Sequence, residues 1–197
     1  MESLALAFTS GWASGINAYL LVLVLGITDR LNDVQEIPDV LARWDVLAAA
    51  ALMFTLEFVA DKIPYVDSTW DAISTAIRPT VGAVIGILIA GEADSLGAAV
   101  AGVVGGGTAL ASHAVKMGSR LAINTSPEPV SNIAASVAED AAVLGIVWFA
   151  IEHPVAAAVV AGVLLVAGLG VLYLAVRVVR RGWRRWRDRR QGPPAYA

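Results

Sequence analysis

Long apolar runs alternate with short polar turns along the chain, and each run is close to the length that crosses a bilayer. A membrane-spanning helix needs about 20 mainly apolar residues, because the hydrocarbon core is about 30 Å thick and a helix rises about 1.5 Å per residue. Six segments meet or approach this requirement, at residues 4–27, 44–60, 67–91, 96–115, 130–151 and 155–179. The pattern therefore predicts an all-α fold, a polytopic membrane helical bundle of about six spans.

The third segment is the least regular of the six. Residues 80–91 are apolar but too short to cross alone, so the helix must extend back to Asp67, a residue type that caps helix starts. This extension places Pro79 inside the helix, where its ring and its missing N–H favour a kink. We therefore expect the third segment to be the place where a simple spanning helix gives way to a kinked or re-entrant one that contributes to a site.

Composition supports a membrane protein. Hydrophobic residues make up 57% of the 197 residues and charged residues only 16%, whereas soluble domains carry about a quarter charged residues. The chain contains no cysteine, which excludes disulfides, thiolate metal sites and cysteine nucleophiles. We expect no cofactor, and whether the acidic residues hold a metal ion stays open.

Lysine and arginine are distributed very unequally between the two sides of the predicted bundle. Twelve of the 14 lie on one side, namely Lys62, Arg78, Lys116, Arg120 and the eight arginines between residues 177 and 190. The other side has only Arg30 and Arg43. Because cytoplasmic loops retain lysine and arginine, six spans with this bias predict a bacterial inner-membrane protein with both termini in the cytoplasm.

The arginine-rich C-terminus is expected to form a unit of its own. Residues 1–180 are predicted to be the transmembrane domain and residues 181–197 a cytoplasmic tail, in which basic clusters alternate with Trp183 and Trp186. Arginines directly after a membrane helix face anionic headgroups, and tryptophans prefer the interface. Nucleic-acid binding through basic and stacking residues is the alternative. We favour a tail that binds the lipid bilayer and does not bind nucleic acid.

The second and third segments resemble the fourth and fifth in layout. Lys62 and Pro64 after one helix correspond to Lys116 and Pro127 after the other, and polar residues open the helix that follows each turn. Transporters are often built from such repeats, with the site at their interface. The alternative is that all hairpins of hydrophobic helices look alike, so a parallel two-span repeat is one of two open interpretations.

Ionisable residues lie inside several of the predicted spans. Such side chains cost several kcal/mol in hydrocarbon, so they usually face the bundle interior or a watery cavity. Glu57 and Asp61 are four residues apart on one face of the second segment. Glu57 has an alternative interpretation as an interfacial carboxylate paired with Lys62 or Lys116.

Helical spacing also aligns polar residues in three further segments. The aligned sets are Asp71, Thr75 and Arg78 in the third segment, His113, Lys116 and Arg120 in the fourth, and Asn132, Ser136 and Glu139, with Asp140 adjacent, in the fifth. A buried arginine can bind a carboxylate through two hydrogen bonds, so we expect Arg78 to pair with Glu139 or Asp140. Together these residues predict a polar vestibule in the cytoplasmic half, or else a salt-bridge network that only locks the bundle.

Small residues mark the first and fourth segments. Gly11 and Gly15 form a small-xxx-small pair close to Asn17, which permits close approach of helices. Gly105 to Gly107 serve the same purpose or mark an unwound segment, which is tolerated only around a protein-lined cavity. Close packing of helices explains each glycine motif alone. A site at a broken helix would require the two glycine motifs to meet at the same depth in the membrane.

Two stretches of the sequence resemble a known family. The first is SGINAYL at residues 14–20, followed by Leu25 and Gly26; the second is EFVADKIPYVDSTWD at residues 57–71, followed by Ile77-Arg78-Pro79 and Gly82-Ala83. Together they resemble an uncharacterised bacterial membrane family catalogued as a domain of unknown function (number four-one-two-six). The resemblance covers roughly residues 5–175 and implies that residues 57–79 are a family hallmark. It implies no reaction or substrate.

These observations favour a small transporter or channel for a polar or ionic solute, with proton coupling as one form of it. The residues expected to bind the solute or ion are Asn17, Glu57, Asp61, Asp71, Arg78, His113, Lys116, Glu139 and Asp140. With only six short spans, a homo-oligomer is expected. The alternatives are a structural or accessory membrane subunit, and a membrane enzyme acting on a lipid headgroup, which is less favoured because no nucleophile with its base is evident.

Overall fold

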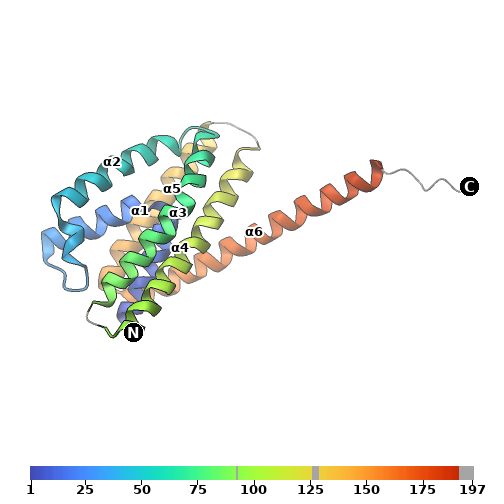
Figure 1. Ribbon diagram of the computed structural model, residues 1–197. Coiled ribbons are helices and arrows are strands. Elements are labelled where there is room, and N and C mark those ends of the chain that lie inside the picture. Colours follow the sequence, from blue (N-terminus) through green and yellow to red (C-terminus); the bar gives the residue numbers. More distant parts are fainter. Residues whose placement is uncertain (92, 126–128, 191–197) are drawn as a thin grey trace, which may run out of the picture.

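The structure, a computed structural model, describes residues 1–91, 93–125 and 129–190 of the chain. The described residues form six α-helices and one short 3-10 helix and contain no strand (Figure 1). The elements are α1 (Glu2–Asn32), η1 (Asp39–Ala42), α2 (Trp44–Ala60), α3 (Val66–Ala90), α4 (Ser95–Ile123), α5 (Pro129–Glu152) and α6 (Pro154–Arg190). The predicted all-α helical bundle is therefore confirmed.

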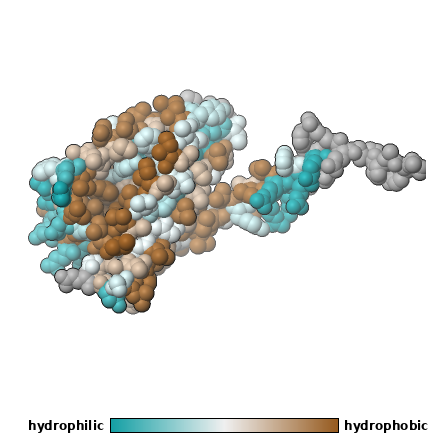
Figure 2. All heavy atoms as spheres, in the orientation of Figure 1, coloured by the Kyte–Doolittle hydropathy of each residue, from teal (hydrophilic) through white to brown (hydrophobic). Residues whose placement is uncertain are grey.

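Within the described residues, five helices could cross a membrane by total length and composition alone, namely α1, α3, α4, α5 and α6. The sixth expected span, α2, has only 17 residues, or about 25 Å of helix, which is at the lower limit for crossing a bilayer. Large apolar side chains cover the outside of the bundle, and polar residues gather at its ends and on the last part of α6 (Figure 2). The protein is thus a multi-pass integral membrane protein.

Helix α1 is bent in the middle. Asn17 has non-helical backbone angles, φ −150° and ψ 96°, and separates two half-helices of about 15 residues each. Its side-chain Oδ1 accepts a hydrogen bond from the backbone N–H of Leu20 at 3.0 Å, which is the geometry of an N-cap for the second half. Each half is only about 22 Å long and therefore too short to cross the hydrocarbon core.

The two ends of α1 lie at the same end of the bundle. Glu2 and Ser3 line one surface hollow together with Gln35 and Glu36, which follow α1, and Glu152, which ends α5. Helix α1 therefore enters the bundle, turns at Asn17 and returns to the end from which it started.

The C-terminal helix α6 starts at this same end and leaves at the opposite one. Leu172 of α6 packs against Gly118 near the far end of α4, and α6 continues beyond it to Arg190. The N-terminus and residues 177–190 of α6 consequently lie at opposite ends of the bundle (Figure 1). The expectation that both termini lie in the cytoplasm assumed a first segment that crosses the membrane, and the membrane side of each terminus stays a prediction.

The irregular element is α1 and not the third segment. Helix α3 is continuous through Pro79, and it begins at Val66 with Tyr65 as the N-cap, so Asp67 is not the cap. Gly105 to Gly107 are helical within α4, so the unwound alternative is wrong for them. Helix α6 also runs without interruption past residue 180, and the division into domain and tail stays a prediction. Pro127, on which part of the two-span repeat depends, lies outside the described residues.

Close contact between α1, α3 and α4 requires glycine. A Cβ on Gly11 or on Gly82 would collide with the backbone of Gly105, and a Cβ on Gly15 would collide with the backbone of Ala109. Helix backbones that approach this closely leave no room for a methyl group, as in other membrane helix pairs. The glycines thus hold three helices together around the bend in α1, which confirms their packing role.

Candidate functional site

Charged side chains from α2, α3, α4 and α5 meet in the interior of the bundle, beside the bend in α1. We call this group the charge cluster; its members are Glu57, Asp61, Asp71, Arg78, Lys116, Arg120 and Glu139, which are connected by ion pairs. Six of them were expected site residues, and Arg120 was expected on the same helix face as Lys116. Four carboxylates share three cations, so the cluster has one formal negative charge more than its cations balance.

Arg78 occupies the centre of one half of the cluster. Its Nη2 lies 2.5 Å from Oε1 of Glu57 and 3.0 Å from Oδ1 of Asp71, and the guanidinium is 1% exposed. The expected partners Glu139 and Asp140 are wrong for Arg78. Helix α1 packs against both α3 and α5, so the carboxylates that reach Arg78 come from α2 and from α3 itself.

His113 is held in one protonation form by its neighbours. Its Nδ1 lies 2.8 Å from Nη1 of Arg78, and because a guanidinium has only donors, Nδ1 must accept this hydrogen bond. Its Nε2 lies 3.1 Å from the carbonyl oxygen of Asp71 and 3.0 Å from Oγ1 of Thr75, so the ring proton belongs on Nε2. The geometry therefore fits a neutral imidazole that positions Arg78.

Lys116 and Arg120 organise the other half of the cluster. The Nζ of Lys116 lies 2.7 Å from Oδ2 of Asp61 and 3.4 Å from Oε1 of Glu57, which joins the two halves. The Nη2 of Arg120 lies 2.6 Å from Oε2 of Glu139. Glu57 is fully buried and pairs with Arg78 and Lys116, so it is not an interfacial carboxylate.

The bend in α1 is built into this site. Arg78 donates to the carbonyl oxygen of Gly15 at 3.3 Å and Lys116 donates to that of Ile16 at 3.0 Å. These carbonyls end the first half-helix, where the helix dipole is negative, so cationic side chains satisfy them well. Asn17 itself lies at this site, where its amide Nδ2 donates to Oδ1 of Asp140 at 2.9 Å. Its expected role in binding a solute or ion stays a prediction.

Several buried carboxylate oxygens near the bend have no hydrogen-bond partner within the described part of the chain. They are Glu57 Oε2, Asp61 Oδ1, Asp71 Oδ2 and Asp140 Oδ2. A buried acceptor without a donor is costly. The Nε donors of Arg78 and Arg120 likewise have no partner among the described residues. Unpartnered acceptors therefore outnumber unpartnered donors in the charge cluster, and a proton or a donating cation would satisfy the excess acceptors.

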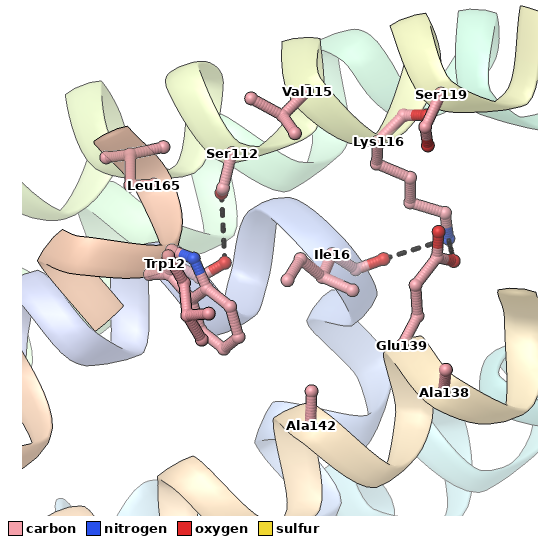
Figure 3. Close-up of a pocket in the computed structure, with 11 residues that line it drawn as sticks. Trp12, Ile16, Ser112, Val115, Lys116, Ser119, Ala138, Glu139, Ala142 and Leu165 are labelled. Atoms are coloured by element: carbon pink, nitrogen blue, oxygen red, sulfur yellow. Dashed lines mark hydrogen bonds and ion pairs between the residues drawn. The ribbon is translucent and has the colours of Figure 1, made fainter. Parts of the chain in front are cut away.

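A pocket of about 280 Å³ adjoins the cluster and is lined by α1, α4, α5 and α6 (Figure 3). Lys116 and Glu139 reach toward one another across it from α4 and α5, as Figure 3 shows. The Glu139 side chain is 18% exposed, whereas the other members of the cluster are at most 3% exposed. Glu139 is consequently the member of the cluster with the most accessible side chain, and this side chain lines the pocket.

A second buried polar group lies nearer to the end of the bundle, and neither its contacts nor its central residue, Asn124, were predicted from the sequence. The amide of Asn124 donates to both carboxylate oxygens of Asp67, at 2.9 and 3.1 Å, and Asn132 donates to Asn124 at 3.0 Å. These residues join the start of α3 to the end of α4 and the start of α5. The missed signal was the pair of asparagines flanking the turn between α4 and α5.

Lys62 lies in the turn between α2 and α3, next to the cluster. It donates to Oγ of Ser136 at 3.3 Å. Partial burial lowers the pKa of the Lys62 ammonium below its usual range, while the nearby carboxylates of Asp140 and Asp61 raise it. Among the residues that the structure describes, no group of three or more histidine, aspartate or glutamate side chains is arranged to hold a metal ion.

Comparison with known families gives a match over residues 4–174, to the family described as a domain of unknown function (DUF4126). The chain belongs to this family. The expected resemblance is thereby confirmed, and the matched residues include the whole charge cluster and the bend in α1. No curated protein and no solved structure matches the chain. DUF4126 brings no activity with it, so the function must be argued from the site.

Proposed function

We propose that this protein is a small membrane transporter or channel for a polar or ionic solute, and that it moves protons through the charge cluster. The observation that carries the proposal is that four carboxylates share three cations inside an apolar bundle, next to a broken helix. Ionisable side chains in a membrane interior are costly and usually mark solute, ion or proton pathways.

A purely structural role accounts poorly for this cluster. Buried ion pairs contribute little net stability, because the cost of removing charges from water offsets their attraction. Well-packed apolar side chains would hold α2, α3, α4 and α5 together at least as well. A static lock would also be expected to balance its charges, whereas Glu57, Asp61, Asp71 and Glu139 outnumber their cationic partners.

The broken helix gives the proposal independent support. Discontinuous helices near the bilayer midplane form ion and substrate sites in many transporters, because the exposed half-helix ends bind charged groups. Here the end of the first half-helix binds Arg78 and Lys116 through the carbonyls of Gly15 and Ile16. Breaking either contact would free a backbone carbonyl and a cationic side chain at the same time. A transporter needs groups of this kind that can bind a solute in one state and pair with each other in another.

The arginine bias and the bent α1 support an orientation of the protein in the membrane. The tail, Lys62, Lys116 and Arg120 belong to the end of the bundle that we place in the cytoplasm of a bacterial cell. The bent α1 supports a position of the N-terminus on the opposite side. We further expect the tail to bind anionic headgroups and the protein to form a homo-oligomer.

The proposal is tested by ion flux in proteoliposomes. The purified chain is reconstituted with a pH-sensitive dye inside, and a potassium diffusion potential drives protons inward, with and without a small amine, a carboxylate or glycerol outside. We expect faster acidification than in protein-free liposomes under at least one condition, and slower acidification with Glu57→Gln or Arg78→Ala. Glu152→Gln, at the polar end of α5, serves as the control that should behave like wild type.

Absence of flux under every condition, together with no effect of Glu57→Gln or Arg78→Ala, would require the transport proposal to be abandoned. Circular dichroism and melting of each variant in detergent separate lost flux from lost folding.

A further inference from the structure

The polar groups that line the pocket between α1, α4, α5 and α6 are mostly committed to protein partners. The ammonium of Lys116 donates to Asp61 at 2.7 Å, to the Ile16 carbonyl at 3.0 Å and to Glu57 at 3.4 Å, so its three protons are used. The hydroxyl of Ser112 donates to the carbonyl of Trp12 at 2.9 Å, and that of Ser119 donates to the carbonyl of Lys116 at 2.7 Å.

The polar atom of the pocket that can still bind an occupant is a hydrogen-bond acceptor, an oxygen of Glu139. Both ion pairs of Glu139, with Arg120 and with Lys116, use its Oε2. Its Oε1 takes part in neither of these ion pairs nor in the hydrogen bond from Arg120, and it belongs to the most exposed side chain of the cluster. Apart from the uncharged indole N–H of Trp12, the lining polar side chains can thus only accept hydrogen bonds. An occupant must therefore bring donors.

The charge balance of the cluster also favours an occupant that donates hydrogen bonds. The cluster contains one more carboxylate than cations, and Glu139 is its member at the pocket. An anionic occupant would meet this carboxylate without any free cation to bind, because Lys116 and Arg120 are already paired. A cation, in contrast, would complete the charge balance.

The remaining walls suit an apolar chain. They are formed by Val115, Leu164, Leu165 and Ala142 together with the indole of Trp12. A volume of about 280 Å³ suits a small molecule and excludes a lipid headgroup with its chains.

We propose that this pocket binds a small alkylammonium ion, with N–H groups on Oε1 of Glu139 and its apolar chain against Trp12 and Leu165. The proposal rests on the proposed transport function, for which it names the substrate class. Because a proton and an ammonium ion compete for the same carboxylate, binding of one displaces the other, and Glu139 is the point where solute and proton exchange.

The test is a binding experiment on the purified full-length chain in detergent, by titration calorimetry with butylammonium, butyrate and tetramethylammonium. We expect butylammonium to bind most tightly, because butyrate has the wrong charge and tetramethylammonium has no N–H. Glu139→Gln should weaken butylammonium binding by about tenfold or more, since it removes a charged hydrogen bond. The matched control Glu152→Gln should leave the affinity unchanged.

Equal affinity of wild type and Glu139→Gln, tighter binding of butyrate, or no binding of butylammonium would overturn the proposal. If Glu139→Gln does not fold, Ala142→Leu, which fills the pocket and leaves the carboxylate, must weaken binding instead. Binding of butylammonium without any flux would overturn transport and keep the pocket, whereas flux without butylammonium binding would overturn only the pocket.

Discussion

The ammonium nitrogen of Lys116 lies 3.0 Å from the carbonyl oxygen of Ile16, one residue before the bend at Asn17. The contact joins a cation of the charge cluster to the end of a half-helix whose last carbonyls have no helical partner. The bend in α1 and the charge cluster therefore depend on each other. Substitutions in the cluster should change the conformation of α1 at the bend, and substitutions at the bend should change the ion pairs of the cluster.

Removal of the cap at the bend should destabilise the protein. Asn17→Ala removes the hydrogen bond to the Leu20 N–H and the donor to Asp140, so we expect a loss of about 1–3 kcal/mol in the free energy of unfolding. Denaturant unfolding in detergent measures it. Asn32→Ala, at the exposed end of the same helix, is the control and should change stability much less. Equal losses for the two variants would contradict the capping role.

The close helix contact at Gly15 makes a steric prediction. Gly15→Ala places a methyl group against the Ala109 carbonyl and the Ser112 side chain, so α1 and α4 must move apart. Overpacking of this kind costs about 1–3 kcal/mol. Gly107→Ala in α4 is the matched control, because nothing lies within 4 Å of the added carbon. A melting temperature for Gly15→Ala as high as that of Gly107→Ala would show that the contact is looser than described.

The buried pair between Glu57 and Arg78 should be more sensitive than a surface pair. Glu57→Gln leaves the buried Arg78 with one counter-ion fewer, and removal of one partner of such a pair costs about 3–5 kcal/mol. Asp45→Asn breaks the exposed pair with Arg43 and should have little effect. Thermal unfolding of the two variants makes the comparison, and similar melting temperatures would contradict the buried network.

The bent α1 predicts an unusual placement of the chain ends. The chain has no cysteine, so single cysteines report position without background. In intact cells, a membrane-impermeant maleimide should label Glu2→Cys and Gln35→Cys. Arg180→Cys in the tail should be labelled only after the membrane is opened. Labelling of Glu2→Cys and Arg180→Cys under the same condition would instead support a first helix that crosses the membrane.

The sequence was a good guide to features that depend on periodicity and composition. The bounds of α2 and α5 were predicted to within a residue or two, because apolar runs are limited by the bilayer thickness. The inward faces of α3 and α4 were also predicted, because residues spaced three or four apart share one side of a helix. For this reason Asp71, Arg78, His113 and Lys116 were all expected in one interior region, where the structure places them.

Features that depend on which helices are neighbours were not predictable in the same way. A polar stripe predicts which way Arg78 faces, and Asp71 lies on the same stripe. The pairing of Arg78 with Glu57 of α2, and not with Glu139 or Asp140 of α5, follows from the position of α1 between α3 and α5. The bend at Asn17 is likewise a tertiary feature, because Arg78 and Lys116 supply the donors that make a broken helix tolerable there. Pro79 has a stronger intrinsic tendency to break a helix than Asn17, and yet α3 is continuous.

The central claim is that the charge cluster exchanges protons with water and is not a static lock. Infrared difference spectroscopy of the purified protein detects protonated carboxyl groups by their C=O stretch, and it is recorded between about pH 6 and pH 9, where carboxyl groups in water are already ionised. We predict a pH-dependent carboxyl band in this range that is reduced in Glu57→Gln, because Glu57 is fully buried in the cluster, and is unchanged in Glu152→Gln at the end of α5. A spectrum without a carboxyl band in this range, with Glu57→Gln identical to wild type, would contradict the account.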